Sequence, residues 1–419
     1  MGSMTDQLAN SPPREEEAPV PPPSAELPVA SAQPVAESPD SVRRSKRYQR
    51  RRMALAAIEW AVEVALLVGL LVSGLSVGLR EWATRRTDNP WLIVFLYLAP
   101  VGLLFGLVSA TFSATRTFRL DRRFALSNES FASWLVDEIK SLALGSLLVL
   151  AAIETLYGLL RYSPERWWAW AGGVFSLFFL LLAQLAPVLI FPLFFRFTRI
   201  TDAEITGRLE RLARQAGTRI EGVYEMNLSR KTRAANAALV GFGRTRRIVL
   251  ADNLLDNFTL DEIEAVLAHE FAHHAQHHLA KAILVQTVTF FVLFYGIHWV
   301  LDAAGNRFGF SGPADPANLP LLGLSATALG LLFLPATNGL LRRFERRADD
   351  YALQAAAQPR AFPSALQRLA QINLADRTPH PLVEWVFYSH PAIGTRIARA
   401  EKILNQSHPL RDNGASQGG

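Results

Sequence analysis

The 419-residue sequence contains no cysteine. The chain can therefore form no disulfide, and it offers no thiolate as a metal ligand or as a nucleophile. Any zinc site must be built from histidine and carboxylate side chains, which is the usual ligand set of catalytic rather than structural zinc. The N-terminal region also lacks a long apolar run, so no signal peptide is expected there.

A large excess of one sign of charge is also missing, since 43 lysines and arginines stand against 37 aspartates and glutamates. The basic residues gather beside apolar runs, so we expect no nucleic acid partner. Hydrophobic residues make up 50% of the chain, and the mean hydropathy is positive. This proportion is high for a soluble protein and predicts several helices in a lipid bilayer.

Residues 1–42 hold nine of the 24 prolines and no aromatic residue, which predicts a disordered N-terminus. Seven basic residues follow within residues 43–52. We interpret this run as a cytoplasmic anchor for the apolar segment that comes next, with nucleic-acid binding as the weaker alternative.

Six apolar segments are long enough to cross a membrane, because each reaches the roughly 20 residues that a spanning helix needs. They lie at about 54–79, 90–113, 140–160, 167–196, 280–303 and 319–340. Arginine-rich ends alternate along them so that the regions between spans four and five and after span six fall on the cytoplasmic side. Glu59, Glu63 and Glu154 lie inside apolar segments, where a carboxylate faces a cavity or pairs with a partner such as arginine.

The region after the fourth apolar segment has the pattern of a soluble α+β fold. Residues 202–216 carry apolar side chains at helical spacing, and Gly217 is suited to a helix C-cap. Residues 219–228, 237–240 and 246–250 have the character of strands, and 237–240 of an edge strand. A capping box of Thr259 and Glu262 predicts a further helix that begins near Leu260 and runs toward the fifth apolar segment.

This last helix contains the pattern His269-Glu270-x-x-His273. Residues four apart lie on one face of a helix, so both imidazoles can bind one Zn²⁺. Glu270 lies just off that face, where its carboxylate can take a proton from water at the metal.

Other histidines near the motif are also four apart, at 273/277 and 274/278. Only the pair at 269 and 273 has a glutamate directly after its first member, which decides the register. We therefore expect His274, His277 and His278 to be polar surface or interface residues rather than ligands.

A catalytic zinc needs a third protein ligand. The best candidate is Glu345, just past the sixth apolar segment, and Asp349 follows one helical turn later, where it could orient a ligand histidine. The alternative is that Glu345 only pairs with the arginines beside it. Spacing alone does not decide between the two.

The chain matches the pattern of a known family in several separate stretches, at 124–128 with 137–140, 187–197, 236–250, 269–278, 343–349 and 388–396. Through them it resembles the family I CAAX prenyl endopeptidases, integral-membrane zinc metalloproteases, over about residues 90–405. The resemblance implies one Zn²⁺ per chain held by His269, His273 and Glu345, with Glu270 as general base. This likeness favours Glu345 as a ligand over its alternative.

The same resemblance implies how a substrate is held. Backbone groups of Asn236 and Ala237 would pair with an extended peptide, because an edge strand offers regular hydrogen-bonding groups. His390 and Arg396 would lie near the substrate as candidate donors to the oxyanion. The eukaryotic members have seven spans where this chain predicts six, and the proline-rich N-terminus matches nothing in the family.

The expected fold is mainly α: a polytopic membrane helical bundle of about six spans with a cytoplasmic zincin-like α+β metalloprotease domain. Its parts are a disordered segment 1–42, a membrane domain 43–197, the metalloprotease domain 198–279, two spans within 280–340, the rest of the metalloprotease domain in 341–405 and a disordered tail 406–419.

The expected activity is hydrolysis of peptide bonds, in a peptide or membrane-protein substrate, at the cytoplasmic face of the inner membrane. A catalytically silent zinc-binding scaffold or regulator is one alternative, and it would be marked by a broken motif, which this chain does not have. A multispan transporter is another, and it leaves the zinc motif unexplained. Whether the substrate is prenylated stays open.

Overall fold

The computed structural model describes residues 38–407 apart from residues 242 and 306. The predicted disordered segment, up to residue 37, and the predicted tail from residue 408 lie outside the described residues. Helix α1 begins at Pro39, where the Ser38 side chain accepts a hydrogen bond from the backbone of Ser41. Residues 39–42 are thus helical, and the predicted boundary at residue 42 is wrong by a helical turn.

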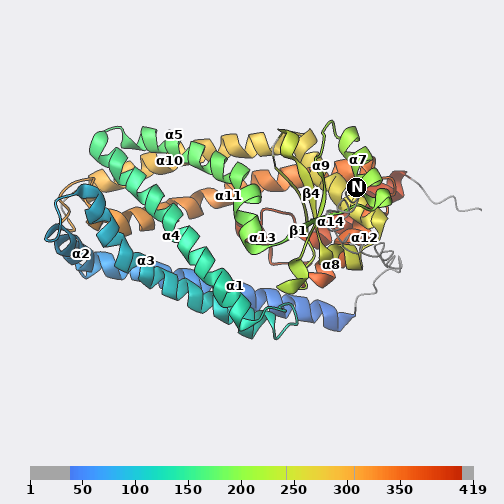
Figure 1. Ribbon diagram of the computed structural model, residues 1–419, viewed down its shortest axis with the longest axis horizontal. Coiled ribbons are helices and arrows are strands. Elements are labelled where there is room, and N and C mark those ends of the chain that lie inside the picture. Colours follow the sequence, from blue (N-terminus) through green and yellow to red (C-terminus); the bar gives the residue numbers. More distant parts are fainter. Residues whose placement is uncertain (1–37, 242, 306, 408–419) are drawn as a thin grey trace, which may run out of the picture.

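Long helices lie lengthwise through the molecule, and a small sheet with shorter helices gathers at one end of them (Figure 1). Six helical stretches of the described chain have the length and composition to cross a membrane, as the sequence predicts. They are α1 (Pro39–Val72), α3 (Pro90–Ala114) with the π-turn Thr115–Asp121, α4 (Phe131–Tyr162), α5 (Trp167–Leu185) with the π-turn Ala186–Ile190 and α6 (Phe191–Phe194), α10 (His278–Ala304), and α11 (Leu319–Ala355) with the 3₁₀ turn Pro316–Asn318.

The short helix α2 (Leu75–Thr84) connects α1 to α3 at the far end of the bundle (Figure 1). Several spanning helices continue beyond the predicted apolar segments into charged turns. The basic run at 43–52 extends α1, and Glu345 lies in the last turns of α11. Apolarity marks only the part of each helix that meets lipid, so the segments predicted from hydropathy are shorter than the helices.

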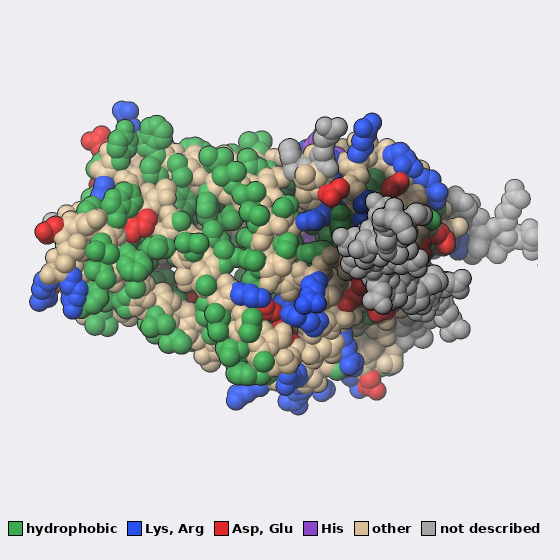
Figure 2. Space-filling view, in the orientation of Figure 1, with side chains coloured by type: hydrophobic (Ala, Val, Ile, Leu, Met, Phe, Trp, Pro, Cys, Tyr) green, Lys and Arg blue, Asp and Glu red, His purple; other side chains and the backbone are tan. Residues whose placement is uncertain are grey.

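The surface of the long helices is apolar. Figure 2 shows hydrophobic side chains spread over the bundle, with charged side chains concentrated toward the two ends of the molecule. Leucines such as Leu103 and Leu332 are 65% and 70% exposed in the isolated chain. An exposed leucine surface of this extent is stable against lipid tails rather than water, which supports a bilayer around this part of the protein.

Two carboxylates inside the spans differ in their partners. Glu59 of α1 forms a 2.9 Å ion pair with Arg116 from the end of the second span, which favours the pairing predicted as the alternative to a cavity role. Oε2 of Glu154 in α4 is buried and has no hydrogen-bond partner among the described residues.

The sheet at the end of the bundle has four strands in the order β1-β2-β4-β3. They are β1 (Phe197–Arg199), β2 (Gly222–Met226), β4 (Arg247–Ala251) and β3 (Ala237–Val240). β2 and β4 are parallel, and the two outer strands pair antiparallel to them. β3 has the predicted bounds and the predicted edge position, β2 is shorter than predicted, and the three-residue β1 was not predicted.

Shorter helices pack around this sheet. They are α7 (Ala203–Gln215), α8 (Asp252–Asn257), α9 (Leu260–Ala275), α12 (Ala361–Ile372), α13 (Pro381–Phe387) and α14 (Ile393–Ser407); 3₁₀ turns occur at Leu228–Arg230 and Gly243–Thr245. Their shared core includes fully buried Leu209, Ile248 and Leu267 with nearly buried Phe362, so residues before and after α10 and α11 build one domain.

Helix α9 is buried on almost every side and packs against α7, α11, α12 and β3. Its N-terminus is fixed by the predicted capping box, in which the side chains of Thr259 and Glu262 each accept a hydrogen bond from the other's backbone N–H. α9 ends at Ala275, and His277, with φ of 55°, turns the chain before α10 begins. The motif helix therefore abuts the fifth span and is not continuous with it.

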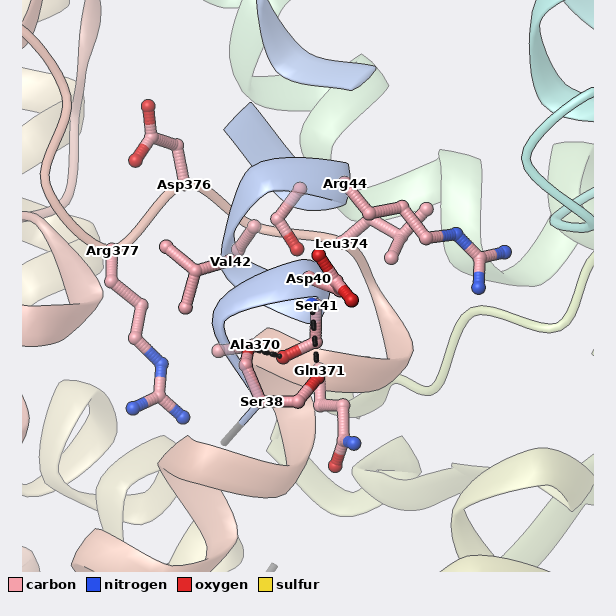
Figure 3. A pocket seen from close by; sticks show the side chains of 12 residues that line it. Ser38, Asp40, Ser41, Val42, Arg44, Ala370, Gln371, Leu374, Asp376 and Arg377 are labelled. Atoms are coloured by element: carbon pink, nitrogen blue, oxygen red, sulfur yellow. Dashed lines mark hydrogen bonds between the residues drawn. The ribbon is translucent and has the colours of Figure 1, made fainter. Parts of the chain in front are cut away.

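The start of α1 contacts both the loop between the second and third spans and the protease domain. Arg44 Nη2 donates to the carbonyl of Phe124 at 2.6 Å, and Gln49 Nε2 donates to that of Leu374 at 2.9 Å. A cavity of about 320 Å³ lies between the first turns of α1 and the segment that follows α12, and Figure 3 shows its lining. None of the predicted site residues lines it, so this cavity belongs to the contact between the two parts and not to the metal cluster.

Candidate active site

Three side chains from two helices meet at the base of the bundle. His269 and His273 come from α9, and Glu345 comes from the last turns of α11. His269 Nε2 lies 3.3 Å from His273 Nε2 and 3.2 Å from Glu345 Oε2, and His273 Nε2 lies 3.4 Å from Glu345 Oε1. These three are the group of metal-binding side chains that the described part of the chain brings together.

The separations suit a tetrahedral metal. Ligand atoms held at ~2.0–2.1 Å around zinc lie about 3.3 Å from one another, close to the three distances between the donor atoms here. Oε2 of Glu345 is buried and makes no hydrogen bond with any described residue, so this acceptor is left for a cation. The side chains of His269 and Glu345 are both 8% exposed, whereas that of His273 is 29% exposed, so the cluster is open on one side.

The Nδ1 atoms of His269 and His273, which face away from the cluster, also have polar contacts. Asp349 Oδ1 lies 2.9 Å from His269 Nδ1, the position that the predicted role of orienting a histidine requires. His278 Nδ1 lies 3.2 Å from His273 Nδ1, and the His278 ring stacks on Phe344 with 4.5 Å between centroids. Both ligand rings therefore present Nε2 to the cluster.

The position of His278 differs from the prediction. It is 3% exposed and contacts His273, although the sequence predicts a surface or interface residue. The prediction is right that His278 is no member of the three-residue cluster. His278 is five residues after His273, a spacing that predicts no contact within one helix. The contact forms because the turn at His277 brings the start of α10 back beside α9.

Arg396 contacts the carboxylate beside His269. Its Nη2 and Nε donate to the two carboxylate oxygens of Asp349 at 2.6 and 3.0 Å, and Nη2 also lies 3.4 Å from His269 Nδ1. Both of these nitrogens are therefore engaged by Asp349. The geometry supports a role in which Arg396 fixes Asp349 against His269.

His390 faces the cluster from the loop between α13 and α14. Its Nε2 lies 3.4 Å from Glu345 Oε1, and its Nδ1 lies 2.9 Å from the hydroxyl oxygen of Ser389. The side chain is 59% exposed, so its ring can meet a molecule bound at the open side of the cluster.

Glu270 and the ligand histidines titrate in ways that follow from burial and charge. Burial raises the pKa of the Glu270 carboxyl above its usual range. Burial lowers the pKa of the His269 imidazole, but the neighbouring carboxylates of Asp349 and Glu345 outweigh burial and raise that pKa to about 9. Burial and the neighbouring His269 lower the pKa of His273 to about 4. The carboxylates thus favour a positive charge on His269, and that charge disfavours a second one on His273.

The edge strand β3 lies against α9. The carbonyl of Asn236 accepts a hydrogen bond from Ala251 N at 3.0 Å, which directs the backbone groups of Asn236 toward β4. The backbone N–H and C=O groups of successive residues point to opposite sides of an antiparallel strand, so those of Ala237 and Leu239 point to the free edge. The Ala237 N–H is bound by the Asn236 side chain at 3.0 Å. Of the predicted pair, only Ala237 has backbone groups at the free edge, and an added peptide would have to take its N–H over from the Asn236 side chain.

Comparison with known proteins agrees with this geometry. Two family models match the chain: Peptidase family M48 over residues 199–404, and CAAX prenyl protease N-terminal, five membrane helices, over residues 24–196. Together they match nearly the whole length. The chain belongs to peptidase family M48.

Relatives of this M48 chain span most of its length. The uncharacterized metalloprotease YhfN of Bacillus subtilis is 29% identical over 376 residues, which covers 88% of this chain and 87% of YhfN. The CAAX prenyl protease 1 homolog of Taenia solium is 24% identical over 441 residues, covering 90% and 91% of the two chains. The crystal structure of S. mikatae Ste24p superposes with a TM-score of 0.78 at 23% identity, over 87% of this chain and 90% of Ste24p, and shows that the fold is shared.

Membership of family M48 confirms the predicted class. The protein is a multi-pass membrane metalloendopeptidase with a metal cofactor and peptide substrates. The silent scaffold gains no support. The N-terminal family model describes five membrane helices, whereas the described part of this range has four that are long enough to span, with the ten-residue α2 between the first two.

Proposed function

We propose that this M48 protein is a zinc-dependent endopeptidase whose metal is held by His269, His273 and Glu345. The observation that carries the proposal is the set of three donor-atom separations of 3.2–3.4 Å. Zinc suits two imidazoles and one carboxylate, and with three protein ligands a fourth position is left for reaction. Zinc bound by these three residues would polarise the scissile carbonyl as a Lewis acid and would lower the pKa of a water molecule at the fourth position.

The general base is Glu270. It follows His269 on α9, so its carboxylate stands beside the cluster without belonging to it. The carboxylate takes a proton from the attacking water and then delivers it to the leaving amine. A raised pKa makes the Glu270 carboxylate a better proton acceptor and brings it closer to neutral pH, where one group can serve as base and then as acid.

Other residues hold the reacting groups. His390 donates a hydrogen bond to the carbonyl oxygen as negative charge develops on it, an interaction that its exposed ring and its place beside Glu345 support. Arg396 and Asp349 keep the His269 ring in one orientation. The outward backbone groups of Ala237 and Leu239 align an extended peptide by strand addition.

The active site is proposed to face the cytoplasm, in a protein of the bacterial inner membrane. Basic residues at the protease end of the spans include the run at 43–52 and Arg116, Arg119, Arg122 and Arg123, which favours that end as the inner side. A smaller basic group at Arg80, Arg85 and Arg86 lies on and just after α2 at the opposite end and weakens the bias without reversing it.

Glu270→Gln tests the proposed chemistry. The amide is nearly isosteric and cannot accept the proton, so cleavage should fall by about 10²–10⁴-fold while zinc content stays the same. His269→Ala and Glu345→Ala should instead lose zinc, measured by metal analysis of detergent-purified protein. Unchanged peptidase activity in Glu270→Gln would contradict the assignment.

The substrate class is tested separately, because relatives named CAAX prenyl proteases and a relative named only as a metalloprotease are both similar to this chain. A prenylated CAAX peptide and an unmodified membrane-protein fragment are compared, each with wild type and with Glu270→Gln. We propose membrane-protein fragments as the substrate, so they should be cleaved by wild type alone. Cleavage restricted to the prenylated peptide would overturn that choice of substrate.

A further inference from the structure

Helix α11 has a polar face that continues beyond the metal ligand. Asn338, Arg342, Glu345 and Asp349 are spaced by four, three and four residues, so they lie on one side of the helix. Each is at most 9% exposed. Glu345 and Asp349 belong to the metal cluster and its supports, whereas Asn338 and Arg342 take no part in the proposed chemistry.

Asn338 and Arg342 bind one short piece of backbone. Arg342 Nη1 donates to the carbonyl of Glu384 at 3.0 Å and to that of Tyr388 at 2.5 Å. Asn338 Nδ2 donates to the carbonyl of Val386 at 2.7 Å. All three acceptors lie in the last turn of α13 or directly after it, two to six residues before His390.

Arg342 is a buried arginine, and its burial has an unfavourable free energy that its contacts must offset. Burying a guanidinium group is unfavourable unless it is well hydrogen-bonded, and Arg342 has no carboxylate within ion-pair distance among the described residues. Its charge instead faces the carbonyl end of α13, where the helix dipole favours a cation and Arg342 adds a second donor to the Glu384 carbonyl, which already accepts from Tyr388 N. An apolar side chain could pack α13 against α11, but it could not fix the position of these carbonyls.

His390 depends on that backbone for its position. Ser389 and Glu345 are the described residues with polar contacts to its ring, and more than half of the side chain is exposed. Packing therefore does not hold the ring at one place. Glu384 also holds the loop after His390, since its Oε1 accepts a hydrogen bond from Ala392 N at 2.9 Å.

We propose that Arg342 and Asn338 are positioning residues for His390. They fix the carbonyls of residues 384–388, and so they set the distance between His390 Nε2 and Glu345. Arg342, Asn338 and Glu345 all belong to α11, so the loop and the carboxylate are held by the same helix. The inference rests on the proposed function, in which His390 donates to the carbonyl oxygen of the substrate. A donor misplaced by about 1 Å loses much of its effect on the transition state, so the loss should appear in kcat.

The test is a double-mutant cycle of Arg342→Gln and His390→Ala, with kinetics on the cleaved peptide and zinc content measured for every variant. Arg342→Gln alone should lower kcat by about tenfold or more, with KM changed by less than about twofold and zinc content unchanged. In the His390→Ala background, Arg342→Gln should change kcat by less than about twofold. The matched control is Arg343→Gln, since Arg343 is the exposed neighbour of Arg342 and should retain wild-type kcat.

Independent losses that multiply in the double variant would overturn the inference, as would loss of zinc from Arg342→Gln. If Arg342→Gln does not fold, Asn338→Ala removes one neutral hydrogen bond and is put through the same cycle with the same criteria. Glu270→Gln tests the proposed function independently of the role of Arg342 and Asn338. If wild type cleaves and Glu270→Gln does not, the proposed function stands, and multiplicative losses then reject only the role of Arg342 and Asn338.

Discussion

Asp349 Oδ1 lies 2.9 Å from Nδ1 of His269, on the side of the ring opposite the nitrogen that approaches Glu345. The same aspartate accepts both N–H groups of Arg396 that face it. An imidazole held at Nδ1 by a carboxylate keeps its proton there and presents Nε2 as the metal ligand. One residue of α11 thus determines which nitrogen of an α9 histidine is available.

Asp349→Asn should weaken metal binding by about 10–100-fold, because the amide no longer stabilises the Nδ1–H tautomer of His269. The affinity is measured by competition with a chromophoric chelator. Asp350→Asn is the matched control, since Asp350 pairs with Arg399 and not with the cluster. Equal affinities of wild type and Asp349→Asn would contradict this role of the aspartate.

His278→Leu should also weaken metal binding, by about tenfold or more, because the ring that contacts His273 Nδ1 is removed while its apolar contact with Phe344 is largely kept. The same chelator competition gives the number. His274→Leu is the control, because His274 contacts Arg246 instead of the cluster. A His278 variant that binds metal like wild type would show that this contact is only incidental packing.

Ala237→Pro should raise KM severalfold with little loss of stability, since the outward N–H of Ala237 makes no bond to β4. Ala238→Pro should instead lower the thermal midpoint, because the register directs the Ala238 N–H toward Val249 of β4. Kinetics and thermal unfolding are compared for both. If the two prolines had the same effect on KM, strand addition at this edge would be the wrong mode of binding.

Glu225→Gln should stabilise the protein at about pH 8 more than at about pH 5. Burial and then the charges of Asp252 and Asp256 raise the pKa of the Glu225 carboxyl. A carboxyl with a raised pKa in the folded state favours folding at low pH, and this contribution is lost as the pH rises through that pKa. Thermal midpoints at the two pH values measure the difference. A Glu225 variant that changed the thermal midpoint equally at the two pH values would refute the prediction.

Local patterns predicted much of the fold. The capping box placed the start of α9 at Leu260, the spacing of apolar residues gave α7, and β3 has the predicted bounds. Each of these depends on residues within one helical turn or one strand. The extent of the spans was underpredicted, because hydropathy does not distinguish a charged turn that continues a helix from a loop.

The sequence predicted the three residues of the cluster and the position of Asp349, but it did not predict the other contacts around them. The motif on α9 was evident from spacing, and Glu345 was favoured only through the family resemblance. The contacts of His278 with His273 and of Arg396 with Asp349 were not predicted, because they depend on the turn at His277 and on the approach of α14 to α11. No periodicity in the sequence encodes such contacts between distant segments.

The polar face of α11 also sets a limit on how this protein can change during evolution. Each residue added to an α-helix rotates the later part of that helix by about 100° and moves it about 1.5 Å along the axis. One inserted or deleted residue between Asn338 and Asp349 would therefore rotate one end of this face relative to the other, so the four side chains could not all keep their contacts with the histidines and with the loop that holds His390. In an alignment of relatives, a gap within these two or three turns should mark proteins that keep the membrane fold and have lost the peptidase.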